Sequence, residues 1–482
     1  MRVLGPSLAV LVGALASVAW ALPSVSPSAS SGPRVRSRPA RAPARPRASR
    51  PRAPRAPSRP RPPRAPAGWS SPFRLAPGVG LDILPAAIAF SPAGAAAITF
   101  GVRDVDAPGR SSAFAILRSP SGSLSGPRRV PGAQEILDPA FDGESTRLLT
   151  GTSPATEACC DSAWVVPFPS TSTRVSGRAR PLVDHLTGGP AVGRLLALNG
   201  RRMLAALATD QGVWVAQSGG AGRFGPARRL TGSGARPGAL AATELRGGRS
   251  VVAWIEGSGG LEGIGPRSIL TASGSRSRAP HSPVTDVTVA SGHRIDELGL
   301  VPGARAPALG WIESWYASGR YNSVVVAADL TRRAPSRTFA LAGELASGLS
   351  LAADSGGDRT QVLAWKGCTS TGECSVRASL RPPRGGFARP IRLGAIDASQ
   401  SPTATVAPNG ETLLGWISGG RVLVADRRAG AARFGAPRVV SGSRASSASD
   451  LALAFGPARQ AIAAWTEGIL GPTVEGAVYR AG

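Results

Sequence analysis

The segment Val362-Leu-Ala-Trp365 shows the form that recurs most clearly along this chain of 482 residues, a short apolar run that ends in a small residue and a tryptophan. The other clear copies end at Trp254, Trp311, Trp416 and Trp465, so that successive tryptophans are 57, 54, 51 and 49 residues apart. Self-similarity at a period of about 50 residues is the signature of a repeat architecture. One supersecondary unit is therefore expected to repeat along the chain.

Weaker copies precede the five clear ones. Phe100 stands at the position of the tryptophan, and degenerate copies lie near Thr150 and Leu207. These anchors have a mean spacing of about 52 residues. The spacing predicts about eight repeats, with seven as the alternative.

Each well-preserved repeat contains four strand-like pieces. The first is rich in small residues, as in Leu451-Ala-Leu-Ala-Phe455, and a turn such as Asn409-Gly410 favours a tight hairpin to the second, which carries the tryptophan. A third piece follows, as in Val422-Leu-Val-Ala425. The fourth contains proline and arginine, as in Phe434-Gly-Ala-Pro-Arg-Val-Val440. Proline removes a donor from the ladder, so this piece is expected at a sheet edge.

The last repeat contains only three of the four pieces. Its third piece is Val474-Glu-Gly-Ala-Val-Tyr479, and residues 71–75, Ser-Pro-Phe-Arg-Leu, have the form of the missing fourth. We therefore expect this N-terminal strand to complete the last unit and to close the repeats into a ring. The alternative, an open array, would leave apolar sheet faces exposed at both ends.

In repeat length and strand order, residues 68–482 resemble the β-propeller superfamily, including sialidase-like and WD-repeat propellers. The resemblance implies an all-β fold of about eight four-stranded blades. The chain has neither a Trp-Asp repeat ending nor a Ser-x-Asp-x-Gly-x-Thr-Trp box. The resemblance is therefore architectural and implies no particular activity.

The N-terminal residues 1–21 have the features of a signal peptide. Arg2 supplies a positive charge, an apolar run extends from Leu8 to Trp20, and Ala19-Trp20-Ala21 fits the cleavage pattern. The apolar run is shorter than the ~20 residues of a membrane span, and no later segment is long and apolar enough. We expect an exported protein, secreted or associated with the cell envelope, without a transmembrane segment.

Residues 22–67 form a low-complexity segment. Between Arg34 and Arg64 there are twelve arginines, many prolines and no acidic residue. Such a composition predicts a disordered spacer, or a tether to an anionic envelope polymer. The whole chain has 56 basic and 29 acidic residues, a net charge of +27, and Lys366 is its only lysine. We interpret this use of arginine as compositional bias rather than as a nucleic-acid footprint.

The four cysteines form two pairs in the sequence. Cys368 and Cys374 flank a turn between two strand-like pieces, and in an exported chain this arrangement predicts a disulfide bond. Cys159 and Cys160 are adjacent and form either a vicinal disulfide or two free thiols. The three histidines of the chain do not have metal-ligand spacing relative to the cysteines. The sequence predicts no metal and no cofactor.

Two sets of residues are candidates for binding. Glu256, Glu313 and Glu467 each stand two residues after a repeat tryptophan, so they belong on one face of the ring. They either bond within their own hairpins or form a carboxylate ring that binds a cation or a sugar. The second set lies on an unusually long hairpin whose aromatic and polar side chains could stack on a sugar, bind a protein or cap their own blade: Trp315, Tyr316, Arg320, Tyr321 and Asn322.

No motif for catalysis is evident. The chain lacks a nucleophile elbow at a strand-to-helix turn, a phosphate loop and a calcium loop. Four acidic residues that lie close in sequence are interpreted as turn formers: Asp104, Asp106, Asp138 and Asp142. We therefore expect an exported, non-enzymatic, monomeric propeller that binds an extracellular glycan or protein or serves as a scaffold. The alternative is a carbohydrate-active, glycosidase-like enzyme that uses the central face of the propeller.

Overall fold

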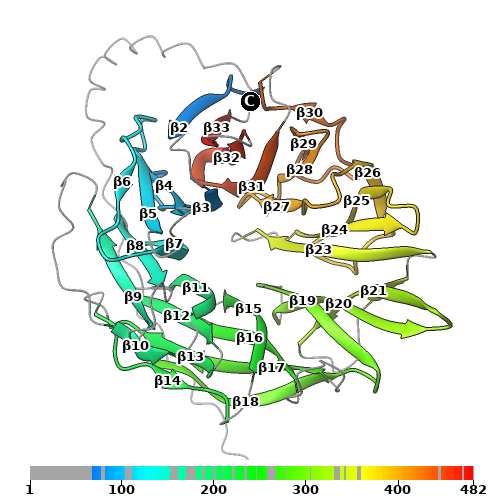
Figure 1. Cartoon of the computed structure of the whole chain (residues 1–482), viewed down its shortest axis with the longest axis horizontal. Coiled ribbons are helices and arrows are strands. Elements are labelled where there is room, and N and C mark those ends of the chain that lie inside the picture. The colour runs from blue at the N-terminus through cyan, green and yellow to red at the C-terminus, as the bar shows by residue number, and fades with distance from the viewer. Residues whose placement is uncertain are drawn as a thin grey trace, which may run out of the picture. The chain divides into compact units, whose positions relative to one another are not determined.

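The computed structural model describes residues 68–480 apart from 77–81, 104–110, 152–160, 170–180, 187–189, 199–201, 210, 220–222, 233–235, 246, 258–266, 276, 304–305, 331–336, 341–342, 355–359, 443–446 and 469–471. The expected signal peptide, residues 1–21, and the Arg/Pro-rich segment, residues 22–67, lie outside the described residues. Eight antiparallel sheets surround a common centre, so the chain is an eight-bladed β-propeller (Figure 1). The expectation of eight blades is confirmed, and the alternative of seven is wrong.

In each of the first four blades, the strands run in sequence order from the central axis to the outer edge. Blade 1 consists of β3 (Asp82–Phe90), β4 (Ala96–Arg103), β5 (Ser112–Arg118) and β6 (Arg128–Arg129); blade 2 of β7 (Glu135–Asp142), β8 (Ser145–Gly151), β9 (Asp161–Phe168) and β10 (Pro181–Leu186); blade 3 of β11 (Pro190–Leu198), β12 (Arg202–Thr209), β13 (Gly212–Gln217) and β14 (Arg228–Arg229); blade 4 of β15 (Arg236–Leu245), β16 (Arg249–Gly257), β17 (Arg267–Ser275) and β18 (Arg278–Thr288).

The other four blades keep the same order. Blade 5 consists of β19 (His293–Val301), β20 (Ala308–Ala317), β21 (Arg320–Asp329) and β22 (Arg337–Ala340); blade 6 of β23 (Glu344–Ala353), β24 (Gln361–Thr369), β25 (Cys374–Arg381) and β26 (Ile391–Ala395); blade 7 of β27 (Thr403–Val406), β28 (Thr412–Ser418), β29 (Arg421–Arg427) and β30 (Arg438–Val439); blade 8 of β31 (Ala448–Phe455), β32 (Gln460–Glu467), β33 (Thr473–Arg480) and the N-terminal strands β1 (Gly68–Trp69) and β2 (Phe73–Ala76).

The N-terminal strands close the ring. Both β1 and β2 pair antiparallel with β33, with Gly68 opposite Arg480 and Phe73 opposite Gly476. The inner strand of blade 8, β31, packs beside β3 of blade 1. The expected closure by residues 71–75 is confirmed, and the structure adds the short strand β1 to it.

The repeat tryptophans fill the spaces between blades. Trp254, Trp365, Trp416 and Trp465 are fully buried within the apolar clusters that join neighbouring sheets. The small residues around them explain the repeat consensus, because a large ring on one sheet needs small side chains opposite it. Among the described residues, no helix is long and apolar enough to cross a membrane.

The topology places two kinds of element on one face. Each blade starts with its inner strand, so the starts of all eight inner strands lie at the same end of the central axis. Since neighbouring strands in a blade are antiparallel, the hairpin between the second and third strands returns to that end. We call this end the inner-start face. The other end holds the turns between first and second strands and between third and fourth strands.

Candidate functional site

The β20–β21 hairpin of blade 5 projects from the inner-start face. Its turn contains Ser318 and Gly319, with φ angles of 54° and 76°, which suits a two-residue hairpin. Tyr316 pairs with Tyr321 across the strands, and their rings pack edge to face with centroids 5.1 Å apart. Both tyrosines are 62% exposed. The hairpin therefore presents aromatic surface that the core of its blade does not use.

A groove of about 500 Å³ lies between this hairpin and blade 6. Its walls are formed by Trp315, Arg320, Tyr321, Asn322, Ser323, Val324, Gly343, Glu344, Leu345 and Ser370. Four of the five hairpin residues expected to bind a ligand thus lie in one groove. The fifth, Tyr316, lies on the same hairpin and does not line it.

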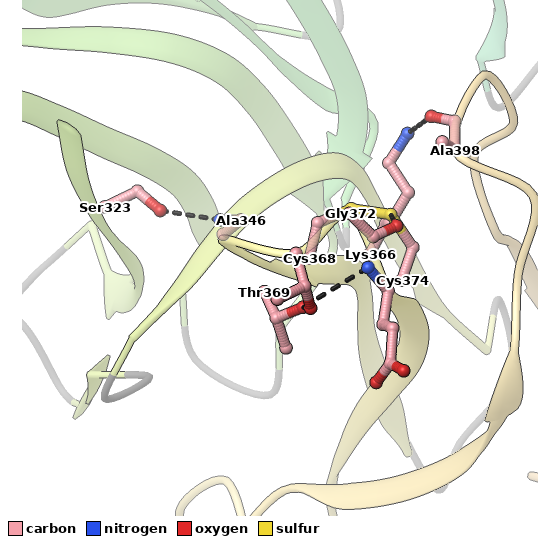
Figure 2. The surroundings of a disulfide bond; sticks show 10 residues. Ser323, Ala346, Lys366, Cys368, Thr369, Gly372, Cys374 and Ala398 are labelled. Carbon is pink, nitrogen blue, oxygen red and sulfur yellow. Dashed lines mark hydrogen bonds between the residues drawn. A yellow bond between two sulfur atoms is a disulfide. The ribbon is translucent and has the colours of Figure 1, made fainter. Parts of the chain in front are cut away.

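A disulfide bond holds the far wall of the groove. Cys368 and Cys374 are bonded across the β24–β25 hairpin (Figure 2). Ser370 lies in the turn between them. The near wall is tied to blade 6 where Ser323 Oγ accepts a hydrogen bond of 2.6 Å from the backbone N–H of Ala346 (Figure 2). The hydrogen bond joins the two walls, and the disulfide closes the hairpin that forms the far one. The other cysteine pair, Cys159 and Cys160, lies outside the described residues.

Glu344 supplies the carboxylate of the groove. One of its oxygens, Oε1, accepts a hydrogen bond from the guanidinium of Arg377. The other, Oε2, is buried and has no hydrogen-bond partner within the described part of the chain. A buried carboxylate oxygen is costly to leave without a donor, so a turn of this side chain toward the groove would let Oε2 accept a hydrogen bond from a ligand hydroxyl or a water. Glu344 does not stand out in the sequence, because it lies at the start of a different blade from the aromatic hairpin.

His293 and Glu313 support the groove from behind Trp315. The ring of His293 stacks on the indole of Trp315 with centroids 4.7 Å apart, and its Nδ1 lies 2.5 Å from Glu313 Oε1. A ring held at one edge by a carboxylate and packed on its face has a fixed orientation. The pair therefore holds a flat surface against the indole of Trp315.

The three glutamates expected on one ring are not brought together. Glu313 is engaged with His293, and Glu467 bonds to Ser447 and to the indole N–H of Trp465 in its own blade. Glu256 lies in blade 4 at the equivalent end of β16. Within the described residues there is no group of three or more His, Cys, Asp or Glu side chains suited to a metal ion. Glu313 and Glu467 therefore bond to partners in their own blades, as in the first of the two alternatives expected from the sequence.

Asp138 has a different place from the turn expected for it. It lies in the inner strand β7 next to a bulge, where its Oδ2 accepts a hydrogen bond of 2.8 Å from Leu195 N–H in the next blade. Burial raises the pKa of Asp138 to about 6, against the opposing effects of Arg194 and of the Leu195 N–H. Glu297, at the matching position of β19, accepts hydrogen bonds from Gly348 N–H and Leu349 N–H. These acids therefore link neighbouring inner strands.

Comparisons with known proteins give similarity in fold. No family model and no curated protein matches the sequence. A solved ulvan lyase structure is 11% identical and has a TM-score of 0.47, covering 83% of this chain and 94% of that one. The α-L-arabinanase of Penicillium chrysogenum is 10% identical with a TM-score of 0.42 over 86% of this chain and 98% of that one. The Hadza microbial sialidase Hz136 is 12% identical with a TM-score of 0.36, covering 69% and 75%. At such identities the likeness shows the fold alone.

One expectation from the sequence is corrected here. A non-enzymatic binding or scaffold propeller was expected, whereas the solved propellers similar to this chain are mostly enzymes that act on carbohydrates. The expectation rested on the lack of a local catalytic motif. A propeller assembles its sites from separate blades, so an acid such as Glu344 and the aromatic hairpin do not form a motif along the chain.

Proposed function

We propose that this protein is a carbohydrate-active enzyme that cleaves a glycosidic bond in a polysaccharide bound at the groove between blades 5 and 6. One observation supports this most strongly: the groove combines the aromatic rings of Trp315 and Tyr321 with a carboxylate oxygen of Glu344 that has no hydrogen-bond partner among the described residues. Sites for small ligands typically join apolar or aromatic walls with a few fixed polar groups.

The walls of the groove suit a sugar chain. The faces of sugar rings carry C–H groups that pack on aromatic rings, which would be the role of Trp315 and Tyr321. Arg320 and Asn322 offer hydrogen-bond donors to ring hydroxyls. A groove that is open at the surface accepts a chain longer than one sugar. The expected export of the protein would bring it to extracellular polysaccharides.

Glu344 is proposed as the general base. Arg377 balances its charge through Oε1. Because Oε2 is buried, the side chain would turn toward the groove on substrate binding, and Oε2 would then accept a proton from a water molecule as that water attacks the anomeric carbon. The glycosidic bond breaks, and the leaving oxygen takes up a proton from a solvent water to become a hydroxyl. The proposed reaction is thus hydrolysis: the attacking water gives its proton to Glu344, and Glu344 releases this proton to solvent at the end of the cycle.

The test is an assay of new reducing ends. The purified protein would be incubated with neutral and acidic polysaccharides, including ulvan and arabinan. With a substrate found, Tyr321→Ala should raise KM about tenfold or more by removing a stacking surface, equivalent to ~1.4 kcal/mol of binding.

The matched control is Tyr316→Leu, since Tyr316 is equally exposed on the same hairpin and does not line the groove, and a leucine keeps apolar contact with the ring of Tyr321. This variant should change KM less than about threefold, which is within ~0.7 kcal/mol. The proposal fails if no polysaccharide gives reducing ends, or if both tyrosine variants affect KM alike.

A further inference from the structure

A second pocket lies on the face opposite the groove, where blades 8 and 1 meet. Its volume is about 550 Å³, and its walls are formed by Gly68, Trp69, Ser70, Ser71, Phe73, Arg118, Gly122, Leu124, Val478 and Arg480. Arg118 ends the third strand of blade 1, and Arg480 ends the third strand of blade 8. The closed ring therefore brings together two arginines that are far apart in the sequence.

Arg118 is buried, and no described residue forms an ion pair with it. It is only 4% exposed, and its Nη1 donates a hydrogen bond of 3.0 Å to the neutral amide oxygen of Gln460. Neither Arg118 nor Arg480 takes part in any of the ion pairs formed by the described residues. Burial lowers the pKa of the Arg118 guanidinium, and the positive charge of Arg480 lowers it further. A buried, uncompensated charge next to a like charge is unfavourable unless an anion joins it.

The remaining walls are mainly apolar. Trp69 packs on Tyr479 with ring centroids 5.4 Å apart, which holds its indole at the pocket. Leu124 is 40% exposed, a large fraction for a leucine beside a charged pocket. Gly122 leaves space over the guanidinium, because a side chain there would lie 3.2 Å from Arg118 Nη2. An occupant would thus meet two guanidinium groups on one side and ring and aliphatic surface on the other.

We infer that this seam pocket binds the carboxylate or sulfate group of an acidic saccharide, with Arg118 and Arg480 holding the anion and Trp69 and Phe73 packing on the sugar ring. Planar guanidinium groups match the geometry of oxyanions. This site is separate from the groove, since the groove lies on the inner-start face and the seam pocket on the other.

The experiment measures Tm with three added compounds: methyl β-D-glucuronide, inorganic sulfate and the neutral methyl β-D-glucoside. At concentrations near ten times Kd, the glucuronide should raise Tm by about 2 °C, and the glucoside should have no effect. Sulfate should bind at least threefold more weakly than the glucuronide, because it lacks the ring.

Arg480→Gln should abolish the shift by the glucuronide, because Arg480 is exposed and can be replaced without unfolding the seam. Arg118→Gln should do the same where it folds. The control Arg421→Gln removes an equal charge from an exposed position in blade 7 and should keep the full shift. Glu344→Gln should also keep it, which separates this inference from the proposed activity.

Equal shifts with Arg480→Gln and Arg421→Gln would overturn the inference, since the effect would then be one of net charge. Stabilisation by the neutral glucoside as strong as that by the glucuronide would overturn the role of the anion. Equal affinity for sulfate and the glucuronide would overturn the role of the sugar ring.

Discussion

The groove between blades 5 and 6 and the closing blade 8 each contain a glutamate paired with an arginine. The side chain of Glu344 is 15% exposed and that of Glu475 is 16% exposed. In blade 8, Glu475 Oε1 accepts hydrogen bonds from Arg74 on β2 and from Thr473 on its own strand, so it ties the N-terminal strand to β33. In the groove, Glu344 keeps one buried oxygen without a partner among the described residues. The comparison teaches that the surroundings, rather than the residue pair, separate a structural acid from a candidate catalytic one.

The largest expected effect concerns the structural side of this comparison. A chain that begins at Pro77 lacks β1 and β2, and with them the buried Leu75 and Ala76. Its free energy of unfolding should fall by about 5 kcal/mol, because apolar area is lost and β33 becomes an unpaired edge. Thermal unfolding and gel filtration should show lower stability and self-association. A chain that begins at Gly68 should equal one that begins at Leu22, and equal stability of all three would contradict ring closure.

Two tryptophans, one in each region, should differ in their contribution to stability. Trp465→Ala removes a fully buried ring in blade 8 and should lower the free energy of unfolding by about 3–5 kcal/mol. Trp315→Ala removes a partly exposed ring and should cost about 1 kcal/mol or less, while it weakens polysaccharide binding. Chemical denaturation and binding assays on both variants test this. Similar losses of stability would remove the distinction between the two regions.

The disulfide bond should have a smaller effect. Replacing both Cys368 and Cys374 by serine removes a crosslink between positions six residues apart in the sequence. The free energy of unfolding should fall by about 2 kcal/mol. Because Ser370 lies between these two positions and lines the groove, KM for a polysaccharide should rise in the same variant. Peptide mapping without reduction checks the pairing. Free thiols at both positions in the wild type would refute it.

The smallest effect is the pH dependence from Asp138. Its pKa in the folded chain, about 6, is above the ordinary value of 3.8, so folding favours its protonated form. The associated stability is complete below about pH 4 and is lost as pH rises through 6. Relative to Asp138→Asn, the wild type should lose on the order of 1–2 kcal/mol between pH 4 and pH 7.5. Denaturation curves at these pH values measure it, and parallel behaviour of both proteins would show that Asp138 is not perturbed.

The sequence predicts the propeller well because the same pattern of tryptophan and small residues packs between successive blades and therefore recurs along the chain. The tryptophan spacing indicates the blade count, and the proline- and arginine-containing pieces indicate the outer edges. These pieces form shorter strands than expected, and β14 and β30 pair over two residues each. Prolines there remove ladder donors, so pairing stops early.

The site is predicted only in part. The hairpin from Trp315 to Asn322 stands out by its aromatic residues, and it does line the groove. Glu344 does not stand out, because its position next to the hairpin depends on how blade 6 packs against blade 5. Asp138 was assigned to a turn since bulges in inner strands leave no clear period in the sequence. Contacts between blades are set by the ring and not by neighbours in the chain.

The most direct measurement is the rate of polysaccharide cleavage by Glu344→Gln and Glu475→Gln, with Tm recorded for both. We expect Glu344→Gln to fold with a Tm close to that of the wild type and to lose at least about a hundredfold in kcat, because a general base is lost. We expect Glu475→Gln to have a lower Tm and an unchanged kcat. Equal kcat values for the two variants, or full activity of Glu344→Gln, would contradict the assignment of the groove as the active site.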